Sequence, residues 1–431
     1  LCSRRTGNSP PRRCVQDKRS IQQGESKMLG NINSETMRAT NLQVIFDYIR
    51  RNEPASRRDI AEFGGLTVAA VSNITSKLLA KGVVVEVGAG ESVGGRRPTL
   101  LGINADCRYA VGIDLTTKQI KLVITNFKAQ IIQECACETP LDCGPEHVLD
   151  SMARMVKESV KSAGIDPQKV IGIGIVSAGP CDPERGIMQS PPNFPDWGNV
   201  PIRDYIQEHT GYPAIFDKDS VGAAMAEYWF GKVGGCGSAF GFLINRAGVG
   251  GALLVDGEVF RGFNGGAGEV GHTIVDVHGA KCSCGNYGCL ETLVNEQRLV
   301  REVATGLKMG RESVLDGIED YDSITLKQIM QAAEDGDILC RNALDRMADY
   351  LAIGIRNIAT LFSPEMIVLS GGMISRYAYF TQTVLKKAKQ RQREKFVKCM
   401  NVVECSFREN QCALGAVALV LEKFYRSIQL D

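Results

Sequence analysis

Residues 265–291 read GGAGEVGHTIVDVHGAKCSCGNYGCLE, and this segment carries the most specific pattern in the chain. Cys282, Cys284 and Cys289 fall within eight residues of one another, and the glycines around them allow a tight loop. Three thiolates with one further ligand suit a tetrahedral zinc ion, so the segment predicts a metal site. His272 and His278, two of the four histidines of the chain, both lie close enough in sequence to supply the fourth ligand.

The same segment resembles the signature of the ROK family, which comprises bacterial repressors and sugar kinases, because it matches GExGH followed by CxCGxxGCxE. The resemblance extends over about residues 38–425, nearly the whole chain. It implies an α/β body of two related lobes with the actin-like ATPase fold of the family's sugar kinases. It also implies that the zinc ligands are His272, Cys282, Cys284 and Cys289. Four protein ligands leave no open coordination position, which is typical of a structural ion.

The resemblance further implies a sugar pocket, and its residues are carried over one motif at a time. The stretch PPNFPDW, residues 191–197, resembles the segment whose asparagine contacts the sugar, which implies Asn193. The stretch DKDSVGAAMAE, residues 217–227, resembles the helix start that carries the catalytic base of the kinases, and Asp219 falls at that position. The remaining sugar ligands implied by the family motifs are Glu269, His272 and Glu291. Carboxylates and a neutral imidazole can accept hydrogen bonds from several sugar hydroxyls.

The phosphate half of a kinase site is poorly matched. In the kinases that this chain resembles, the first strand of the body is followed by the motif Asp-x-Gly-Gly-Thr, whereas residues 114–118 read DLTTK. The β-branched Thr116 and Thr117 resist the backbone geometry by which glycines let N–H groups approach ATP phosphates. Arg246 also stands where the family's kinases have the first glycine of a Gly-Thr-Gly turn. We therefore expect no kinase activity and a vestigial base at Asp219; the alternative is an ATP-dependent, glucokinase-like sugar kinase with a regulatory head.

The first hundred residues predict a winged helix-turn-helix. The stretch 38–51 carries apolar residues at i, i+3, i+4 and i+7, which form one face of a helix: Leu42, Ile45, Phe46 and Ile49. Ser56, with Asp59 three residues later, predicts the capped start of a short second helix over 57–63. A Gly-Gly pair then allows a tight turn, and two helices joined in this way are typical of DNA-binding heads.

Thr67 predicts the start of a third helix, which Gly82 closes. The residues of this helix expected to face inward are Val68, Val71, Ile74, Leu78 and Leu79. The apolar stretches 83–87 and 99–101 flank a glycine-rich loop, so they predict a hairpin wing with Arg96 and Arg97 at its tip.

In this motif the third helix enters the major groove of DNA. The outward side chains expected to approach the bases are Thr67, Ala69, Ala70, Ser72, Asn73, Ser76 and Lys77. Among them Asn73 has the amide that pairs with adenine. Arg96 and Arg97 on the wing would hold phosphates or reach the minor groove. The alternative for this part of the chain is a three-helix protein-interaction domain.

Charge is unevenly distributed along the chain. The net charge is +1, but residues 1–100 hold 16 Lys and Arg against 9 Asp and Glu, whereas the remainder holds 34 against 40. A basic N-terminal part joined to a mildly acidic body favours contact with a polyanion such as DNA. We expect residues 1–33 to form a disordered basic tail, residues 34–104 the winged helix-turn-helix, and residues 105–431 the sugar-binding body with its zinc loop at 265–291.

The composition, 44% hydrophobic and 23% charged, is typical of a globular protein. No apolar run approaches the roughly 18 residues that a membrane-spanning helix needs, so no membrane contact is expected. Residues 1–27 lack the apolar centre of a secretory signal. The 15 cysteines are therefore expected to stay reduced, in a cytoplasmic protein.

Together these features predict a sugar-responsive DNA-binding transcriptional regulator of the repressor branch of the family, similar to the xylose repressors. We expect it to repress carbohydrate-utilisation genes. Its expected partners are operator DNA, a small sugar and a second copy of the chain, in a homodimer or higher homo-oligomer that presents two heads to a palindromic operator. Sugar bound between the lobes would then change the affinity of the heads for DNA.

Overall fold

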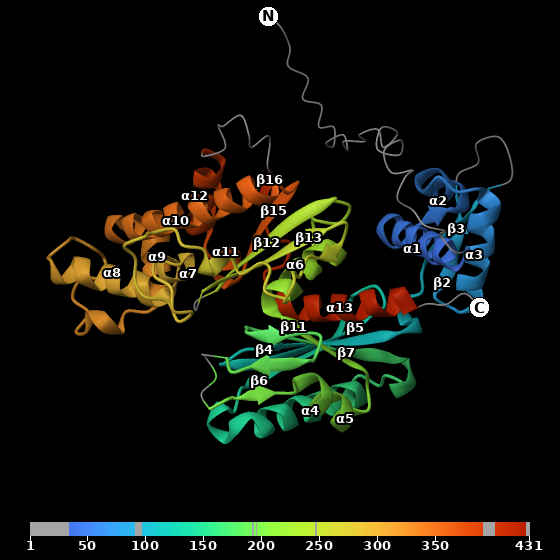
Figure 1. The fold of residues 1–431 in the computed structure, drawn as a ribbon, viewed down its shortest axis with the longest axis horizontal. Coiled ribbons are helices and arrows are strands. Elements are labelled where there is room, and N and C mark those ends of the chain that lie inside the picture. The colour runs from blue at the N-terminus through green and yellow to red at the C-terminus, as the bar shows by residue number, and fades with distance from the viewer. Residues whose placement is uncertain are drawn as a thin grey trace, which may run out of the picture.

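The computed structural model describes residues 34–90, 97–191, 194, 196–245, 248–390 and 401–427, with side chains from Thr40 onward. The expected basic tail, residues 1–33, lies outside the described residues. The chain forms a small N-terminal head and a body of two α/β lobes, which confirms the predicted fold class (Figure 1). No helix in the described part of the chain is long and apolar enough to cross a membrane.

The head consists of three helices and a three-stranded antiparallel sheet in the order β1-β3-β2. Its elements are α1 (Ser34–Asn52), β1 (Ala55–Ser56), α2 (Arg57–Gly64), α3 (Val68–Ala80), β2 (Val84–Ala89) and β3 (Thr99–Ile103). Strands β2 and β3 are the two arms of the wing. The arrangement of helices and hairpin is that of a winged helix-turn-helix.

Local sequence signals set the ends of the head's helices. The Ser56 side chain accepts a hydrogen bond from Asp59 N, and the Asp59 carboxylate accepts one from Ser56 N, so the expected capping box is formed. Thr67 accepts from Ala70 N in the same way at the start of α3. One inward residue was predicted wrongly: Val68 is 51% exposed. It is the first residue of α3 and lies before the turn that packs on the core, so helical spacing alone misplaces it.

The first lobe is built on a five-stranded sheet in the order β11-β7-β4-β5-β6. Its strands are β4 (Tyr109–Leu115), β5 (Gln119–Asn126), β6 (Ile131–Glu138), β7 (Val170–Ser177) and β11 (Ala214–Lys218). Helices α4 (Gly144–Ser162) and α5 (Ile202–Thr210) cover one face, and α13 (Gln411–Ser427) covers the other. A small sheet of β8 (Cys181–Asp182), β9 (Ile187–Gln189) and β10 (Asn199–Val200) lies beside it.

The second lobe has a five-stranded sheet in the order β14-β13-β12-β15-β16. Its strands are β12 (Ser238–Ile244), β13 (Val249–Val255), β14 (Glu258–Val259), β15 (Met366–Ser370) and β16 (Asn401–Glu404). The helices packed with it are α7 (Leu290–Leu293), α8 (Glu296–Lys308), α9 (Leu326–Glu334), α10 (Ile338–Phe362), α11 (Gly372–Arg376) and α12 (Ala378–Gln390). Asp337 caps α10 by accepting a hydrogen bond from Cys340 N.

Two helices occupy the space between the lobes, α6 (Asp219–Phe230) and α13. They pack so closely that a Cβ placed on Gly415 of α13 would lie 1.8 Å from the carbonyl oxygen of Gly222 in α6. On its other side α13 rests on the backbone of β7, because a Cβ on Gly174 would lie 2.0 Å from Ala416 O. The two glycines therefore let backbone meet backbone, and α13 joins α6 to the sheet of the first lobe.

The head and the body share one hydrophobic core. Buried residues of α1, among them Ile45 and Phe46, pack in the same cluster as Phe127 of the first lobe and Tyr425 of α13. Figure 1 shows the blue head beside the C-terminal end of the red helix α13. The head is therefore held against the body by apolar contacts.

The backbone contact at Gly415 makes a direct stability prediction. Gly415→Ala forces a methyl group into the Gly222 carbonyl, and overpacking of this kind costs about 1–3 kcal/mol or more. We expect thermal denaturation to show a lower unfolding temperature. The matched control is Gly372→Ala at the start of α11, where an added Cβ meets nothing within 4 Å. Equal unfolding temperatures for the two variants would contradict the tight packing of α6 on α13.

Candidate functional site

The four residues implied as metal ligands come together in one cluster. The ligand atoms of His272, Cys282, Cys284 and Cys289 all lie within 4.8 Å of one another. The Sγ atoms of Cys284 and Cys289 are 3.7 Å apart, and Cys282 Sγ lies 3.5 Å from His272 Nδ1. All three cysteines are free of disulfides. The cluster could hold a metal ion.

The choice between the two nearby histidines follows from this geometry. His278 is exposed, and its backbone N–H donates to the Asp276 side chain in a turn away from the cluster. His272 ends a short 3-10 helix, Val270–His272, and points Nδ1 at the thiols. Backbone pairing of Ile274 with Cys289 and of Lys281 with Tyr287 closes the cysteine loop.

The carboxylates implied as sugar ligands gather at the same end of the second lobe. Asp219 is the first residue of α6, Glu269 precedes the 3-10 helix of His272, and Glu291 lies in α7 directly after Cys289. Glu291 Oε1 is 3.8 Å from Cys282 Sγ, and its other oxygen lies against Gly248. Glu269 interacts electrostatically with both Asp219 and Glu291. The structure thus brings Asp219, Glu269, His272 and Glu291 together.

Burial makes these carboxylates unusual acids. Burial, opposed by a hydrogen bond from Ser220 N and assisted by the negative Glu269, raises the pKa of Asp219 to about 6. Burial, with the charge of Asp219, also raises the pKa of Asp114 to about 7. The pKa of Glu291 is raised by burial as well. Buried carboxylates with raised pKa values in a cluster are typical of a ligand site.

Two residues that the sequence analysis did not assign to the site lie in this cluster. Lys218 is buried, and its Nζ donates to Glu269 Oε1 at 2.5 Å and to Gly265 O at 3.1 Å. Burial raises the pKa of the Cys181 thiol in β8, and this thiol interacts electrostatically with Asp219 and Lys218. The lysine could have been found from the sequence, because it stands between an apolar strand and Asp219, where a charge needs a partner.

The turn after β4 is closed by hydrogen bonds between Thr116 and Gln119. Thr116 closes it with its side chain: the hydroxyl donates to Gln119 O and accepts from Gln119 N, while Thr116 N also donates to Gln119 O. Thr139 adds a hydrogen bond to Thr116 O. The hydroxyl and the backbone N–H of Thr116 are therefore both bonded to the backbone of Gln119.

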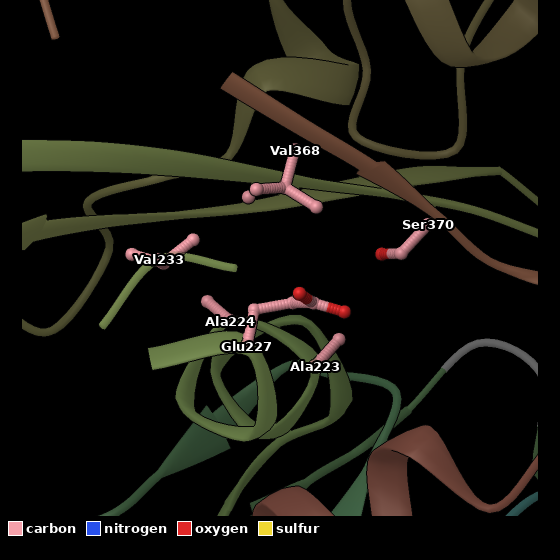
Figure 2. A pocket seen from close by; sticks show the side chains of 7 residues that line it. Ala223, Ala224, Glu227, Val233, Val368 and Ser370 are labelled. Carbon is pink, nitrogen blue, oxygen red and sulfur yellow. The ribbon is translucent and has the colours of Figure 1, made fainter. Parts of the chain in front are cut away.

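Behind the carboxylates, the C-terminal half of α6 encloses only a very small cavity. Figure 2 shows the cavity between α6 and the sheet of the second lobe, with Glu227, Ala224 and Val368 among its lining residues. Its volume is about 10 Å³, enough for at most one water molecule. Glu227 accepts hydrogen bonds from Ser406 N and Ser406 Oγ. The cavity is too small for a sugar, and Glu227 ties α6 to the chain after β16.

The residues expected to contact DNA lie along one side of α3. Thr67, Ala69, Asn73 and Ser76 are exposed, and the remaining members of the set are half-buried: Ala70, Ser72 and Lys77. Arg97 is described and precedes β3. Three residues singled out from the sequence lie outside the described residues: Arg96, Asn193 and Arg246.

Comparisons with known proteins place this geometry in a family. The model of the ROK family matches residues 110–423. A xylose repressor of Caldicellulosiruptor bescii is 33% identical over 393 residues, which cover 90% of this chain and 97% of that relative. The DNA-binding transcriptional dual regulator NagC of Escherichia coli is 26% identical and covers 95% of this chain and 98% of its own length.

Solved structures agree with this placement. A ROK family transcriptional regulator, described as a homologue of the E. coli Mlc protein, is similar with a TM-score of 0.75 and 25% identity, over 90% of this chain and 97% of its own. A ROK family glucokinase from Streptomyces griseus, solved with glucose and AMPPNP, shares the fold with a TM-score of 0.62 and 24% identity, over 72% of this chain and 98% of its own. The regulator spans head and body, and the chain belongs to the ROK family.

Proposed function

We propose that this protein is a sugar-responsive transcriptional repressor of carbohydrate-utilisation genes. The observation that carries the proposal is the union, in one chain, of a winged helix-turn-helix head with a clustered set of carboxylates in a ROK body. The relatives that match over nine tenths of the chain or more include xylose repressors and an N-acetylglucosamine repressor. The proposal assigns residues 34–104 to the head and residues 105–431 to the body.

The head would bind operator DNA through α3. An exposed helix that follows a tight turn is the element that enters the major groove in this motif. Asn73, exposed in the middle of α3, would pair with an adenine edge, and Arg96 and Arg97 would bind phosphates from the wing. A homodimer would present two such helices to a palindromic site.

The body would bind a monosaccharide at Asn193, Asp219, Glu269, His272 and Glu291. The clustering of the last four supports this set, because convergent acceptors in a partly buried site suit several hydroxyl groups at once. If His272 coordinates a metal through Nδ1, its other ring nitrogen stays available to the sugar. By thermodynamic linkage, a sugar that changes operator affinity must have its own affinity changed by the operator to the same degree.

Phosphoryl transfer is not expected of this site. Thr116 fills its own turn with a side chain and three hydrogen bonds, whereas a phosphate-binding turn offers free backbone N–H groups to the nucleotide. The xylose repressor, NagC and the Mlc homologue, each of which matches over nine tenths of this chain or more, are regulators rather than kinases by name. Asp219 would therefore serve as a sugar ligand and not as a base.

The metal cluster would hold a structural Zn²⁺ through His272, Cys282, Cys284 and Cys289. Zinc bonds of about 2.3 Å to sulfur and 2.0–2.1 Å to nitrogen, at tetrahedral angles, separate two sulfurs by about 3.8 Å and a sulfur from a nitrogen by about 3.6 Å. The observed separations of 3.7 and 3.5 Å fit this geometry. The ion would fix the loop that positions Glu291 and His272 beside the sugar.

The DNA proposal predicts two different effects of mutation. Using an operator fragment selected by the wild-type chain from a random library, Asn73→Ala should weaken binding by about 5- to 150-fold, the value of one good base contact. The double variant Arg96→Ala, Arg97→Ala should weaken binding. It should also make the slope of log affinity against log salt concentration shallower, by the amount expected for about two lost phosphate contacts. Fluorescence anisotropy measures both. Lys308→Ala, which removes an exposed ion pair on the body, is the control, and a loss of the same size there would contradict the assignment.

The sugar proposal predicts selective stabilisation. In a thermal-shift screen of pentoses, hexoses and amino sugars, at least one should stabilise the wild type, by about 2.7 kcal/mol at a hundred times its Kd. Asp219→Asn keeps the shape of the side chain but replaces one of its two acceptor oxygens with an NH2 donor. We therefore expect the affinity for the sugar to fall by roughly tenfold or more. Glu312→Gln, an exposed carboxylate in the body, should leave affinity unchanged. Stabilisation by no sugar at all would refute the sugar site.

The zinc proposal predicts one tightly bound ion per chain. Cys284→Ala should lose the metal and lower the unfolding temperature by several degrees, because binding energy at a structural site contributes to folding. Cys143→Ala is a matched control, since Cys143 is also an exposed free cysteine. Metal content is measured with a colorimetric chelator after unfolding. Equal zinc content in the two variants would contradict the ligand set.

A further inference from the structure

Helix α6 joins the carboxylate cluster to the head. Its N-terminal end holds Asp219, preceded by Lys218 as the capping residue. Its C-terminal end, about 18 Å away for twelve helical residues, holds Tyr228 and Trp229. Both aromatic side chains contact arginines of α1 in the head. One short rigid element therefore has the proposed sugar site at one end and the head at the other.

The contact at the C-terminal end is a stack of three side chains. The Arg50 guanidinium lies 4.1 Å from the centre of the Trp229 ring, and its Nη1 donates to Trp229 O at 2.6 Å. Trp229 in turn stacks on Tyr425 of α13, with ring centres 5.1 Å apart and planes 8° from parallel. We call Arg50, Trp229 and Tyr425 the aromatic clasp. A cation held over the face of an indole is a strong contact when it is buried.

The clasp is nevertheless incompletely satisfied. Arg50 Nε and Trp229 Nε1 are buried and, within the described part of the chain, have no hydrogen-bond partner. Burial lowers the pKa of Arg50, although the Asp47 carboxylate, 3.2 Å from Arg50 Nη2, offsets part of this effect. Buried donors without partners weaken the arrangement that holds them. The clasp is therefore a weaker point in the contact between head and body than the apolar packing around it.

The N-terminal end of α6 is restrained by a contact that a sugar would disturb. Lys218 Nζ, one residue before the helix, is bonded to Glu269 Oε1. Glu269 is a proposed sugar ligand, and a sugar hydroxyl that donates to this carboxylate competes with the lysine. Asp219, the first residue of α6, is a second proposed ligand of the same sugar. Occupancy of the site therefore changes the forces on the first turn of α6.

The surroundings of α6 favour transmission along its axis. A Cβ on Gly250 of β13 would lie 2.9 Å from the Ser220 side chain, and one on Gly241 of β12 would lie 3.0 Å from Ala224. On the opposite side, the helix meets α13 at the Gly222–Gly415 contact. A helix packed this closely on both sides moves as a rigid body. Closely packed cores switch between discrete arrangements and do not deform gradually.

We propose that α6 transmits sugar occupancy to the DNA-binding head by shifting Trp229 within the aromatic clasp. This inference rests on the proposed function and names the route of its regulation. Sugar draws Asp219 and Glu269 together and releases Lys218, α6 moves as a unit, and the stack of Arg50 on Trp229 changes. The head is then held less firmly, or at another angle, on α13.

The chain contains two tryptophans, Trp197 and Trp229, which makes the clasp directly observable. In a Trp197→Phe chain, all indole fluorescence comes from Trp229. The chain is titrated with D-xylose and with N-acetyl-D-glucosamine while calorimetry measures binding. We expect the emission to change and to saturate with the calorimetric Kd. Binding heat with unchanged Trp229 emission overturns the proposal and leaves the proposed function intact, whereas the absence of binding by any sugar in the screen refutes both.

A second measurement tests whether the clasp carries the coupling. In the wild type, sugar should change operator affinity by roughly 5- to 150-fold, the usual range for allosteric coupling. Arg50→Ala should bring this ratio to near one while sugar still binds. Arg50→Lys, which keeps the charge without the planar stacking group, should give an intermediate ratio and shows that the head remains folded.

The control for this measurement is Arg58→Ala, an exposed arginine on α2 of the same head. It should alter the operator affinities with and without sugar equally and so leave their ratio at the wild-type value. A wild-type ratio in both arginine-50 variants overturns the clasp as the route, even if sugar and DNA bind as proposed.

Discussion

The backbone packing of α13 is the constraint on which the other parts of the structure depend. This helix lies on β7 with no side chain between them at Gly174, and it meets α6 in the same way at Gly415. Its inner residues belong to two buried clusters, one shared with the head and one shared with the second lobe. A single helix thus contacts the first lobe, α6 and the head. A bulkier residue at Gly174 would push α13 away from β7, and one at Gly415 would push α13 away from α6.

In the proposed regulator, the closely packed helix α6 connects the sugar site to the head. The carboxylates and Lys218 lie at one end of α6, and the aromatic residues lie at the other. No flexible linker between the two needs to be invoked, since the described backbone is continuous from Asp217 through Trp229. A change at the site is therefore transmitted by displacement of a rigid element between two packed surfaces.

The sequence was informative wherever the signal was local. The caps at Ser56 and Thr67 follow from short-range spacing, and the structure contains them. The family resemblance named His272 as the ligand beside the cysteines, which the residues alone left open between two histidines. The site residues Asp219, Glu269 and Glu291, implied in the same way, do lie together. Their roles as ligands stay predictions.

Features that depend on long-range packing could not be predicted. Lys218 and Glu269 are 51 residues apart, and Arg50 and Trp229 are 179 apart, so no local pattern pairs them. Val68 has the spacing of a core residue, yet it lies at the first position of α3, beyond the surface on which the helix packs. Helical periodicity gives the face of a helix but not where along its length the core begins.

The contact between α1 and α13 has a consequence for how the protein is made. The head is synthesised before α13, and domains generally fold as they emerge from the ribosome. Tyr425, which contacts Phe46 of the head from near the end of the described chain, is therefore added only after the head has been synthesised. Under the proposed regulation, a nascent head would lack its contact with α13, and completion of α13 would couple it to the sugar site.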